Sequence, residues 1–184
     1  MEESHCGRIE GFRFVQDALN PVWQHGGMKN YAQDCKSAVI PGMRYRDCLA
    51  AIEWLCTALG FEKYAVYMGQ GNSVMHAELT FGNGMIMLGS ASNQSEYTKF
   101  TALPDDLGGR ETRSVSLIVS DADAVYAQAK AAGTEMVFEL REMNYGGKAF
   151  TCRDPEGYLW HVGTYNPWSA GGKILADEEE KADL

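Results

Sequence analysis

The sequence has no long hydrophobic run, which limits where the protein can work. No apolar stretch in its 184 residues approaches the roughly 20 residues that a helix needs to span a bilayer. The N-terminus does not resemble a signal peptide, because Glu2, Glu3 and His5 replace the basic segment and no apolar segment follows. We therefore expect a cytoplasmic protein without a membrane partner.

Positive charge is also scarce. The chain carries 16 Lys and Arg residues against 25 Asp and Glu residues, which gives a formal net charge of −9 at pH 7. Nucleic-acid binding needs a basic surface that displaces counterions from phosphates, so no nucleic-acid partner is expected. The acidic balance would suit a cationic ligand, whereas an acidic small molecule would need only a local arginine.

Paired cysteines and several familiar catalytic motifs are missing as well. The cysteine count is odd and no C-x-x-C pair occurs, which indicates free thiols in a reducing compartment rather than a disulfide framework or a zinc site. The chain also lacks the G-x-S-x-G elbow, the phosphate-binding P-loop and the H-E-x-x-H zinc motif. The five cysteines are Cys6, Cys35, Cys48, Cys56 and Cys152.

The pattern that is present divides the chain into three parts. Residues 1–36 show no usable periodicity and are interpreted as an N-terminal appendage. Residues 37–168 alternate between strand-like and helix-like patterns and form the predicted domain. Residues 169–184 end in a charge run, which is interpreted as an acidic, solvated tail.

The first half of this domain has the pattern of a strand, a helix and three further strands. Residues 39–46 predict the first strand. Asp47 is the expected N-cap of a helix that runs to residue 59, and Gly60 is its expected left-handed C-cap. The three following strands are predicted at residues 62–68, 74–81 and 85–89.

The second half repeats this order after a polar loop at residues 90–112. Asp121 is the expected N-cap of its helix and Gly133 the expected C-cap. The predicted elements are a strand at residues 115–119, a helix at 122–132, and strands at 135–140, 149–153 and 158–164.

The caps and turns of the two halves match at a nearly constant offset of 73 or 74 residues, which indicates an internal repeat. The chain therefore contains two βαβββ modules, at about residues 38–90 and 113–168. We predict an α+β fold in which the two modules form a mixed β-sheet that encloses a cleft. The matching pairs are Asp47 with Asp121, Gly60 with Gly133, and Gly84 with Gly157.

The last predicted strand carries one histidine, His161. It follows a type I turn at Asp154-Pro155-Glu156-Gly157. Strand alternation places Leu159 and His161 on one face and Trp160 on the other. Two interpretations stay open: a core histidine bonded to a backbone carbonyl, or a ligand or acid–base group inside a cavity.

Paired βαβββ modules with Asp154-Pro-Glu-Gly-Tyr-Leu-Trp160 entering the last strand resemble the vicinal oxygen chelate superfamily. That superfamily includes glyoxalase I, the bleomycin-resistance proteins and the extradiol dioxygenases. Shorter stretches, such as Arg44–Asp47, His76–Leu79 and Met87–Gly89, are similar to the glyoxalase-like or PhnB-like proteins of bacteria. The resemblance covers about residues 38–168 and implies the fold far more specifically than the reaction.

The resemblance also implies where a metal would bind. In metal-using members, four His, Glu or Gln ligands come from the first and last strands of each module. The first-strand positions map to Ile40 and Ser114, and the last-strand positions map to Leu88, or Met87 if the register shifts by one, and His161. Only His161 is an ordinary ligand for a divalent metal, so no metal or other cofactor is expected.

The alternative is a displaced site for a divalent metal, built from His161, His76 and Glu78. His76 and Glu78 lie two residues apart on one predicted strand, so their side chains share a face. A histidine–carboxylate pair near the sheet surface, without a metal, accounts for the same two residues.

Aromatic and basic residues supply further candidate ligand-binding groups. Trp160 and Trp168, in and after the last strand, would stack on a flat ligand. Arg44 and Arg46 project from the same face of the first strand and would hold a carboxylate or phosphate through paired hydrogen bonds. Salt bridges to the acidic surface at the rim are the competing interpretation for both arginines.

Tyr145 is a further candidate, because it precedes the Gly146-Gly147 turn in a predicted flap with Arg110 and Arg113. We expect a glyoxalase- or bleomycin-resistance-like homodimer that binds a small molecule, aromatic ligands included, in the cleft without a metal. The alternative is a metal-dependent lyase, isomerase or dioxygenase with the displaced site. A third hypothesis is a metal-free enzyme in which His161 is the general base.

Overall fold

The computed structural model describes residues 32 and 34–169 of the chain. Residues 39–169 belong to one compact unit, which contains all the elements below. The predicted appendage, residues 1–36, and the predicted tail, residues 169–184, lie almost entirely outside the described residues. Within the described part, no helix is both long enough and apolar enough to cross a membrane.

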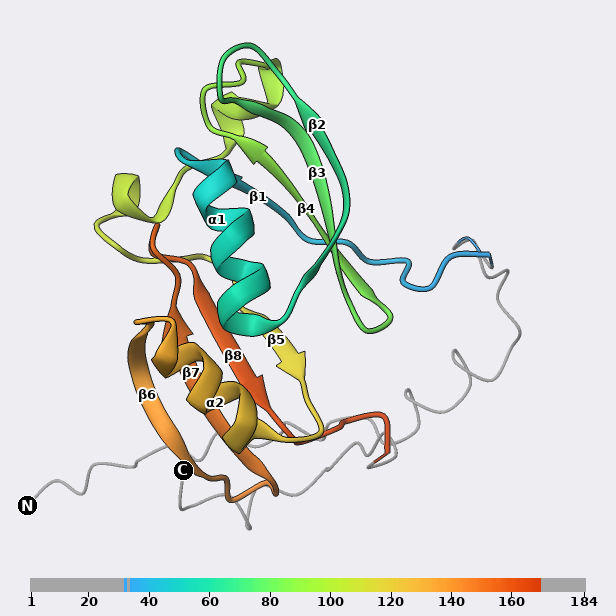
Figure 1. The fold of residues 1–184 in the computed structure, drawn as a ribbon, viewed down its shortest axis with the longest axis vertical. Coiled ribbons are helices and arrows are strands. Elements are labelled where there is room, and N and C mark those ends of the chain that lie inside the picture. Colours follow the sequence, from blue (N-terminus) through green and yellow to red (C-terminus); the bar gives the residue numbers. More distant parts are fainter. Residues whose placement is uncertain (1–31, 33, 170–184) are drawn as a thin grey trace, which may run out of the picture. The chain divides into compact units, whose positions relative to one another are not determined.

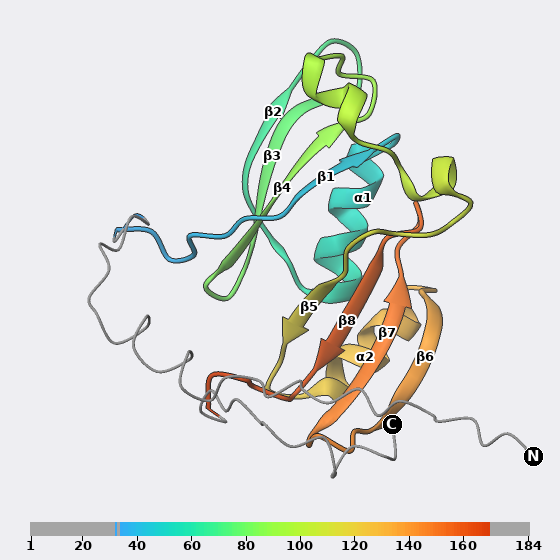
Figure 2. The same cartoon turned by 180° about the vertical axis from the view of Figure 1, so that it is seen from behind.

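The unit contains two four-stranded sheets with the same strand order (Figures 1 and 2). Module 1 has the order β1-β4-β3-β2 and module 2 has the order β5-β8-β7-β6. In each module the first and last strands pair in parallel and the remaining pairs are antiparallel. The strands are β1 Gly42–Tyr45, β2 Glu62–Met68, β3 Val74–Phe81, β4 Gly84–Ser90, β5 Val115–Ile118, β6 Glu135–Glu142, β7 Lys148–Arg153 and β8 Leu159–Gly163. The predicted α+β fold of two βαβββ modules is confirmed.

Each module has one helix; both begin at the predicted caps and the first ends at the predicted Gly60, whereas the second ends one residue early, with Ala132 and not Gly133 as its C-cap. Helix α1 (Cys48–Trp54) continues as a π-helical turn (Leu55–Leu59), and α2 spans Ala122–Ala131. The carboxylates of Asp47 and Asp121 each accept a hydrogen bond from the backbone N–H three residues on, at 3.0 Å. The wider π turn was not predicted, because no residue in the segment distinguishes it from an α-helix.

Each helix packs on one face of its sheet (Figures 1 and 2), and we call the opposite face the open face. Along β4, Ile86, Leu88 and Ser90 are buried, while Met87 and Gly89 between them are partly exposed. The buried residues of both modules belong to one continuous hydrophobic cluster. The open faces therefore hold the side chains that are free to meet a ligand.

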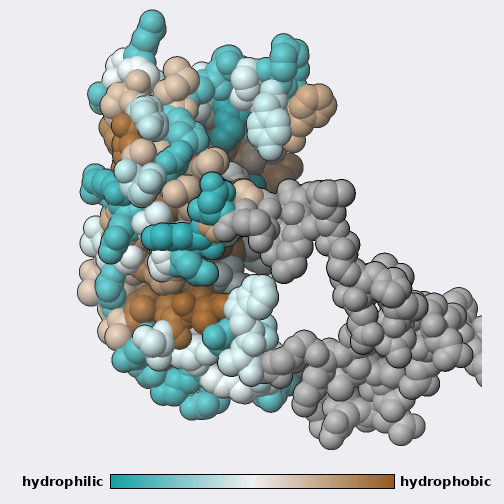
Figure 3. All heavy atoms as spheres, turned by 90° about the vertical axis from the view of Figure 1, so that its right-hand side faces the viewer, coloured by the Kyte–Doolittle hydropathy of each residue, from teal (hydrophilic) through white to brown (hydrophobic). Residues whose placement is uncertain are grey.

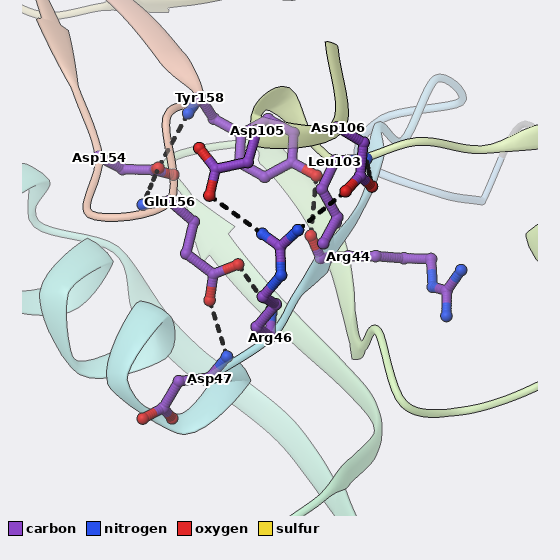
Figure 4. A network of polar contacts seen from close by, with 9 residues as sticks. All are labelled: Arg44, Arg46, Asp47, Leu103, Asp105, Asp106, Asp154, Glu156 and Tyr158. Atoms are coloured by element: carbon purple, nitrogen blue, oxygen red, sulfur yellow. Dashed lines mark hydrogen bonds and ion pairs between the residues drawn. The ribbon is translucent and has the colours of Figure 1, made fainter. Parts of the chain in front are cut away.

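A polar clamp in module 2 joins the two modules (Figure 4). Asp154 is 4% exposed, and its carboxylate accepts hydrogen bonds from the Tyr45 hydroxyl at 2.8 Å and the Trp160 indole N–H at 3.3 Å. Glu156 accepts bonds from the backbone N–H groups of Arg46 and Asp47, each at 2.7 Å. The turn before β8 is thus fixed to the junction of β1 and α1.

Candidate functional site

A hollow lies over the open face of module 1. It has a cavity volume of about 870 Å³ and is enclosed by β1, β3, β4 and the loop that joins the modules. That loop contains two 3₁₀ turns, Glu96–Phe100 and Pro104–Leu107. We call this hollow the module 1 cleft. Its lining includes Gly42, Arg44, Met75, His76, Met87, Asn93, Tyr97, Phe100, Arg110, Glu111, Arg113 and Tyr158.

Apolar side chains make up much of the wall. Met75 is 59% exposed, Tyr97 is 70% exposed and Phe100 is 83% exposed, although all three are large and hydrophobic. A side chain placed at Gly42 would meet no atom within 4 Å, so the space above the first strand is open. A cleft of this size and character can accept a small organic molecule.

Arg44 fixes the joining loop rather than reaching freely into the cleft. Its guanidinium donates to the carbonyl of Ala91, to the carbonyl of Asn93 at 3.0 Å and to the hydroxyl of Thr101 at 3.3 Å. The Asn93 amide in turn donates to the carbonyl of Val74 at 2.8 Å. We predicted that Arg44 would form paired hydrogen bonds to a ligand. In the structure these donors bind the joining loop instead.

Arg46 does not line the cleft. It forms ion pairs with Asp105 at 3.3 Å and Asp106 at 2.9 Å, and its side chain is 48% exposed (Figure 4). The rim salt bridge that was the competing interpretation for this residue is what the structure contains. In the same view the Arg44 side chain extends away from the Arg46 guanidinium, so the two groups do not converge on one point.

Arg110 and Arg113 line the cleft from the joining loop. The guanidinium carbon of Arg113 lies 5.8 Å from the centre of the Tyr158 ring, a cation–π contact. Arg110 donates from its Nε to the carbonyl of Leu107 at 3.3 Å. Between them, Glu111 accepts a bond from the backbone N–H of Leu159 at 2.7 Å, and burial raises the pKa of this carboxyl.

His76 and Glu78 form the predicted pair on β3. The imidazole Nε2 lies 3.1 Å from the carboxylate Oε1, and the side chains are 39% and 22% exposed. The Tyr67 ring lies beside His76, with the two ring centres 6.1 Å apart. His76 reaches the cleft lining, whereas Glu78 does not. The histidine–carboxylate interpretation of these two residues accounts for their contact.

The sheet register moves the metal positions that the resemblance implied. On the open faces, Gly42 pairs with Met87 and Ser116 pairs with His161, a constant offset of 74 residues. Leu88 is 2% exposed and points to the helix side, so the last-strand position is Met87. Gly42 and Ser116 are the first-strand residues paired with these two positions, and the predicted Ile40 and Ser114 each lie two residues before them.

These residues do not fit a divalent metal. Of the four equivalent positions only His161 carries an ordinary ligand atom. Nor does the described part of the chain contain any group of three or more His, Cys, Asp or Glu side chains arranged to hold an ion. The displaced site predicted from His161, His76 and Glu78 is thus not assembled within one chain.

His161 lies on the open face of module 2, outside the core. Its Nδ1 is 3.1 Å from the hydroxyl of Thr151 on β7, and burial lowers the pKa of the imidazole. The core histidine bonded to a carbonyl is therefore wrong in both place and partner. The second interpretation, an acid–base or ligand group, stays open because the side chain is partly exposed.

The aromatic candidates are separated from the cleft. Trp160 has no exposed surface and packs edge-on against Phe61, with ring centres 5.5 Å apart, so it cannot stack on a ligand. The alternation of β8 turns it toward the helices. Trp168 is 88% exposed, and Tyr145 packs against Tyr165 with ring centres 5.3 Å apart. None of these residues lines the module 1 cleft.

Sequence reasoning missed the apolar wall of the cleft. Met75, Tyr97 and Phe100 were not candidates, because single apolar residues in strands and loops are common, and Met87 was considered only as a metal position. The available signal was a pair of aromatic residues in an otherwise polar loop. On the side of the molecule drawn in Figure 3, apolar residues likewise gather in separate brown patches among hydrophilic ones.

Comparison with known proteins agrees with this architecture. The chain is 26% identical over 132 residues to the uncharacterized protein Mb0911c of Mycobacterium bovis, covering 72% of this chain and 86% of that protein. TioX from Micromonospora sp. ML1 is 28% identical with a TM-score of 0.57, over 70% of this chain and 98% of that one.

A glyoxalase I mutant from Zea mays shares the fold alone, at 16% identity and a TM-score of 0.51, over 67% of this chain and 43% of that one. The family model of the Glyoxalase/Bleomycin resistance protein/Dioxygenase superfamily matches residues 39–162. This range contains both helices, strands β1 to β7 and all of β8 except Gly163. The chain therefore belongs to the Glyoxalase/Bleomycin resistance protein/Dioxygenase superfamily.

Proposed function

We propose that the protein binds a small organic molecule in the module 1 cleft without a bound metal. The observation that carries the proposal is the cleft itself: a hollow of about 870 Å³ with exposed Met, Tyr and Phe side chains and a few convergent polar groups. Lining of this kind is typical of sites that bury most of a small ligand.

The identity of the side chains on the open faces supports binding over metal chemistry. A zinc site for catalysis needs three protein ligands, and a non-haem iron site needs two histidines and a carboxylate. Here the equivalent positions are occupied by glycine, methionine, serine and a single histidine.

The test is a ligand screen on protein that has been treated with a chelator. Aromatic and charged compounds are ranked by thermal shift, and the best is measured by isothermal titration calorimetry. Met87→Trp, which fills the cleft, is expected to weaken binding by about tenfold or more. Met68→Trp is the matched control, because Met68 is exposed on β2 and does not line the cleft.

His161 separates binding from catalysis. If the protein only binds, His161→Ala leaves the affinity for the ligand within a few fold, because the residue does not line the module 1 cleft. Binding that disappears when the chelator is present, and returns with a divalent metal, would contradict the proposal.

We further propose that the protein is a cytoplasmic homodimer. In a single chain, the open face of module 2 leaves Ile118 42% exposed and Phe138 56% exposed. A second copy that covers these side chains would bury apolar surface that is otherwise in water. Light scattering after size exclusion tests this, and a monomer at micromolar concentration would contradict it.

One observation favours a second candidate, a metal-free enzyme with His161 as general base. Burial lowers the pKa of the imidazole, which favours its neutral form, and the Thr151 hydroxyl orients Nδ1. In the tautomer whose Nδ1–H donates to that hydroxyl, Nε2 is the nitrogen that can accept a proton. Turnover of a ligand found in the screen, lost in His161→Ala and kept in Met68→Trp, would establish this alternative.

A further inference from the structure

The module 1 cleft has the opposite charge to the protein as a whole. Its charged lining residues are Arg44, Arg110, Arg113 and Glu111, so three positive charges and one negative charge leave +2 with His76 neutral. The chain as a whole carries −9. A basic hollow in an acidic protein concentrates anions locally, because the field in a cleft is set by the nearest charges.

The two arginines of the joining loop are the groups that can meet an anion. Arg44 is occupied by the carbonyls of Ala91 and Asn93. By contrast, Arg110 and Arg113 form no ion pair with any carboxylate in the described part of the chain, whereas Arg46 and Arg153 do. Both side chains are exposed at the cleft.

The one acidic lining residue, Glu111, offsets part of the charge of Arg113, with which it interacts electrostatically, and forms no ion pair with Arg110 or Arg113. The carboxylate of Glu111 accepts the backbone N–H of Leu159, and burial raises its pKa. Arg113 is held over the Tyr158 ring, whose hydroxyl donates to the carbonyl of Arg44 at 2.7 Å. The guanidinium of Arg113 therefore has a fixed neighbour below it and hydrogen-bond donors left for a ligand.

Large apolar side chains lie on the same loop and on the sheet opposite. Tyr97 and Phe100 come from the first 3₁₀ turn, and Met75 and Met87 come from β3 and β4. A ligand that meets both the arginines and these residues needs an anionic group at one end and an apolar body at the other.

We propose that the ligand of the module 1 cleft is an aromatic or otherwise apolar anion, such as an aryl carboxylate, sulfonate or phosphonate, whose charged group binds Arg110 and Arg113. This rests on the proposed binding function and reverses the expectation of a cationic ligand from net charge. Arginine suits planar or tetrahedral oxyanions because its fork of N–H donors matches two oxygens at once.

Three naphthalene compounds of the same shape and different charge test the proposal by isothermal titration calorimetry. They are a naphthalenesulfonate, the corresponding sulfonamide, which is neutral, and naphthylmethylammonium, which is cationic. The sulfonate is expected to bind about tenfold tighter than the sulfonamide, since hydrogen bonds to charged groups are the stronger ones. The cation is expected to bind most weakly.

Variants locate the anion site. Arg110→Gln and Arg113→Gln are each expected to lower the affinity for the sulfonate by about five- to tenfold and to leave the sulfonamide unchanged. Lys130→Gln is the matched control, because it removes the same charge from an exposed residue of α2 that pairs with Glu139. It is expected to change neither affinity. High salt should weaken the sulfonate alone.

The outcomes distinguish a failure of the anion site from a failure of the proposed small-molecule binding. Equal affinity for sulfonate and sulfonamide, both blocked by Met87→Trp, would overturn the anion site and leave small-molecule binding in place. Unchanged sulfonate binding in both arginine variants would also overturn it. If none of the three compounds binds to folded protein, the anion site and aromatic binding in this cleft both fail.

Discussion

The two modules place different chemistry at equivalent positions of the same sheet. In module 1, the register joins Gly42, Met87 and Glu78 across β1, β4 and β3. In module 2, it joins Ser116, His161 and Thr151 across β5, β8 and β7. The first set leaves open space beside a thioether, and the second has a serine and a threonine as the strand neighbours of a histidine, with the threonine hydroxyl bonded to the imidazole.

This difference shows that the repeat preserves a scaffold and not a site. Backbone pairing fixes where side chains on the open face stand, but the residue type at each position decides what they can do. Glycine and methionine suit a wall that contacts an apolar ligand, whereas serine, histidine and threonine suit a polar contact. Accordingly, Gly42 and Met87 line the cleft over module 1, whereas the equivalent positions of module 2 carry Ser116 and His161.

The turns before the last strands differ as well. In module 1 only Gly82 and Asn83 separate β3 from β4, and Asn83 is exposed. In module 2 the turn runs from Asp154 to Tyr158. The Asp154 carboxylate accepts hydrogen bonds from the Tyr45 hydroxyl and the Trp160 indole N–H. The longer turn therefore adds polar contacts between the modules to the packing of their shared hydrophobic cluster.

Among the variants that compare the two modules, Trp160→Ala is expected to lower the free energy of unfolding the most. The indole is fully buried, so its removal should lower the free energy of unfolding by about 4 kcal/mol. Ile86, the equivalent residue of module 1, is 3% exposed, and Ile86→Val should cost about 1 kcal/mol. Denaturant unfolding measures both. A small loss for Trp160→Ala would mean that the tryptophan is not in the core.

Asp154→Ala should have the next largest effect. The change leaves the buried Tyr45 hydroxyl and Trp160 indole N–H without their shared acceptor, which should cost about 3 kcal/mol. Asn83→Ala in the corresponding turn is the control, and its effect should stay within about 0.5 kcal/mol because the side chain is exposed. Equal losses in the two variants would show that the modules are not joined through this turn.

Arg46→Gln should have a smaller effect. Its ion pairs with Asp105 and Asp106 are about half exposed, so the change should cost less than about 1 kcal/mol and leave ligand affinity unchanged. Calorimetric titration of the ligand into the Arg46→Gln and Arg113→Gln variants compares an arginine at the rim with an arginine in the cleft. A large loss of ligand affinity in Arg46→Gln would return this residue to the binding site.

The smallest effect expected is a pH dependence from module 2. Burial lowers the folded-state pKa of His161 below 6.5, so the unfolded chain binds more protons than the folded one between that pKa and pH 6.5. Stability should therefore fall as the pH falls through this window, and His161→Gln should flatten the slope. A slope that is unchanged in the variant would assign it to other groups.

Sequence patterns predicted the elements well because each had local signals. Asp47, Gly60, Asp121 and Gly133 bounded both helices, and β2 and β3 have the predicted ends. The constant offset between the two halves was read from these same residues, and it predicted the fold of two equivalent modules.

The site was predicted less well, for physical reasons. A shift of one residue in register reverses the face of every side chain, which is why Leu88 was preferred to Met87. Trp160 was assigned to the correct face of its strand, but alternation does not show that this face is buried against the helices. The path of the joining loop depends on tertiary contacts of Arg44 that no local pattern encodes. Hence the positions of Arg110 and Arg113 in the cleft could not be assigned from the chain alone.

The most direct test of the account is the metal content of the purified protein, measured before and after incubation with Zn, Ni, Mn or Fe(II). With one ordinary ligand among the four equivalent positions, we predict sub-stoichiometric metal under every condition. One tightly bound metal per chain, lost in His161→Ala, would contradict the account and establish a metal centre that includes module 2.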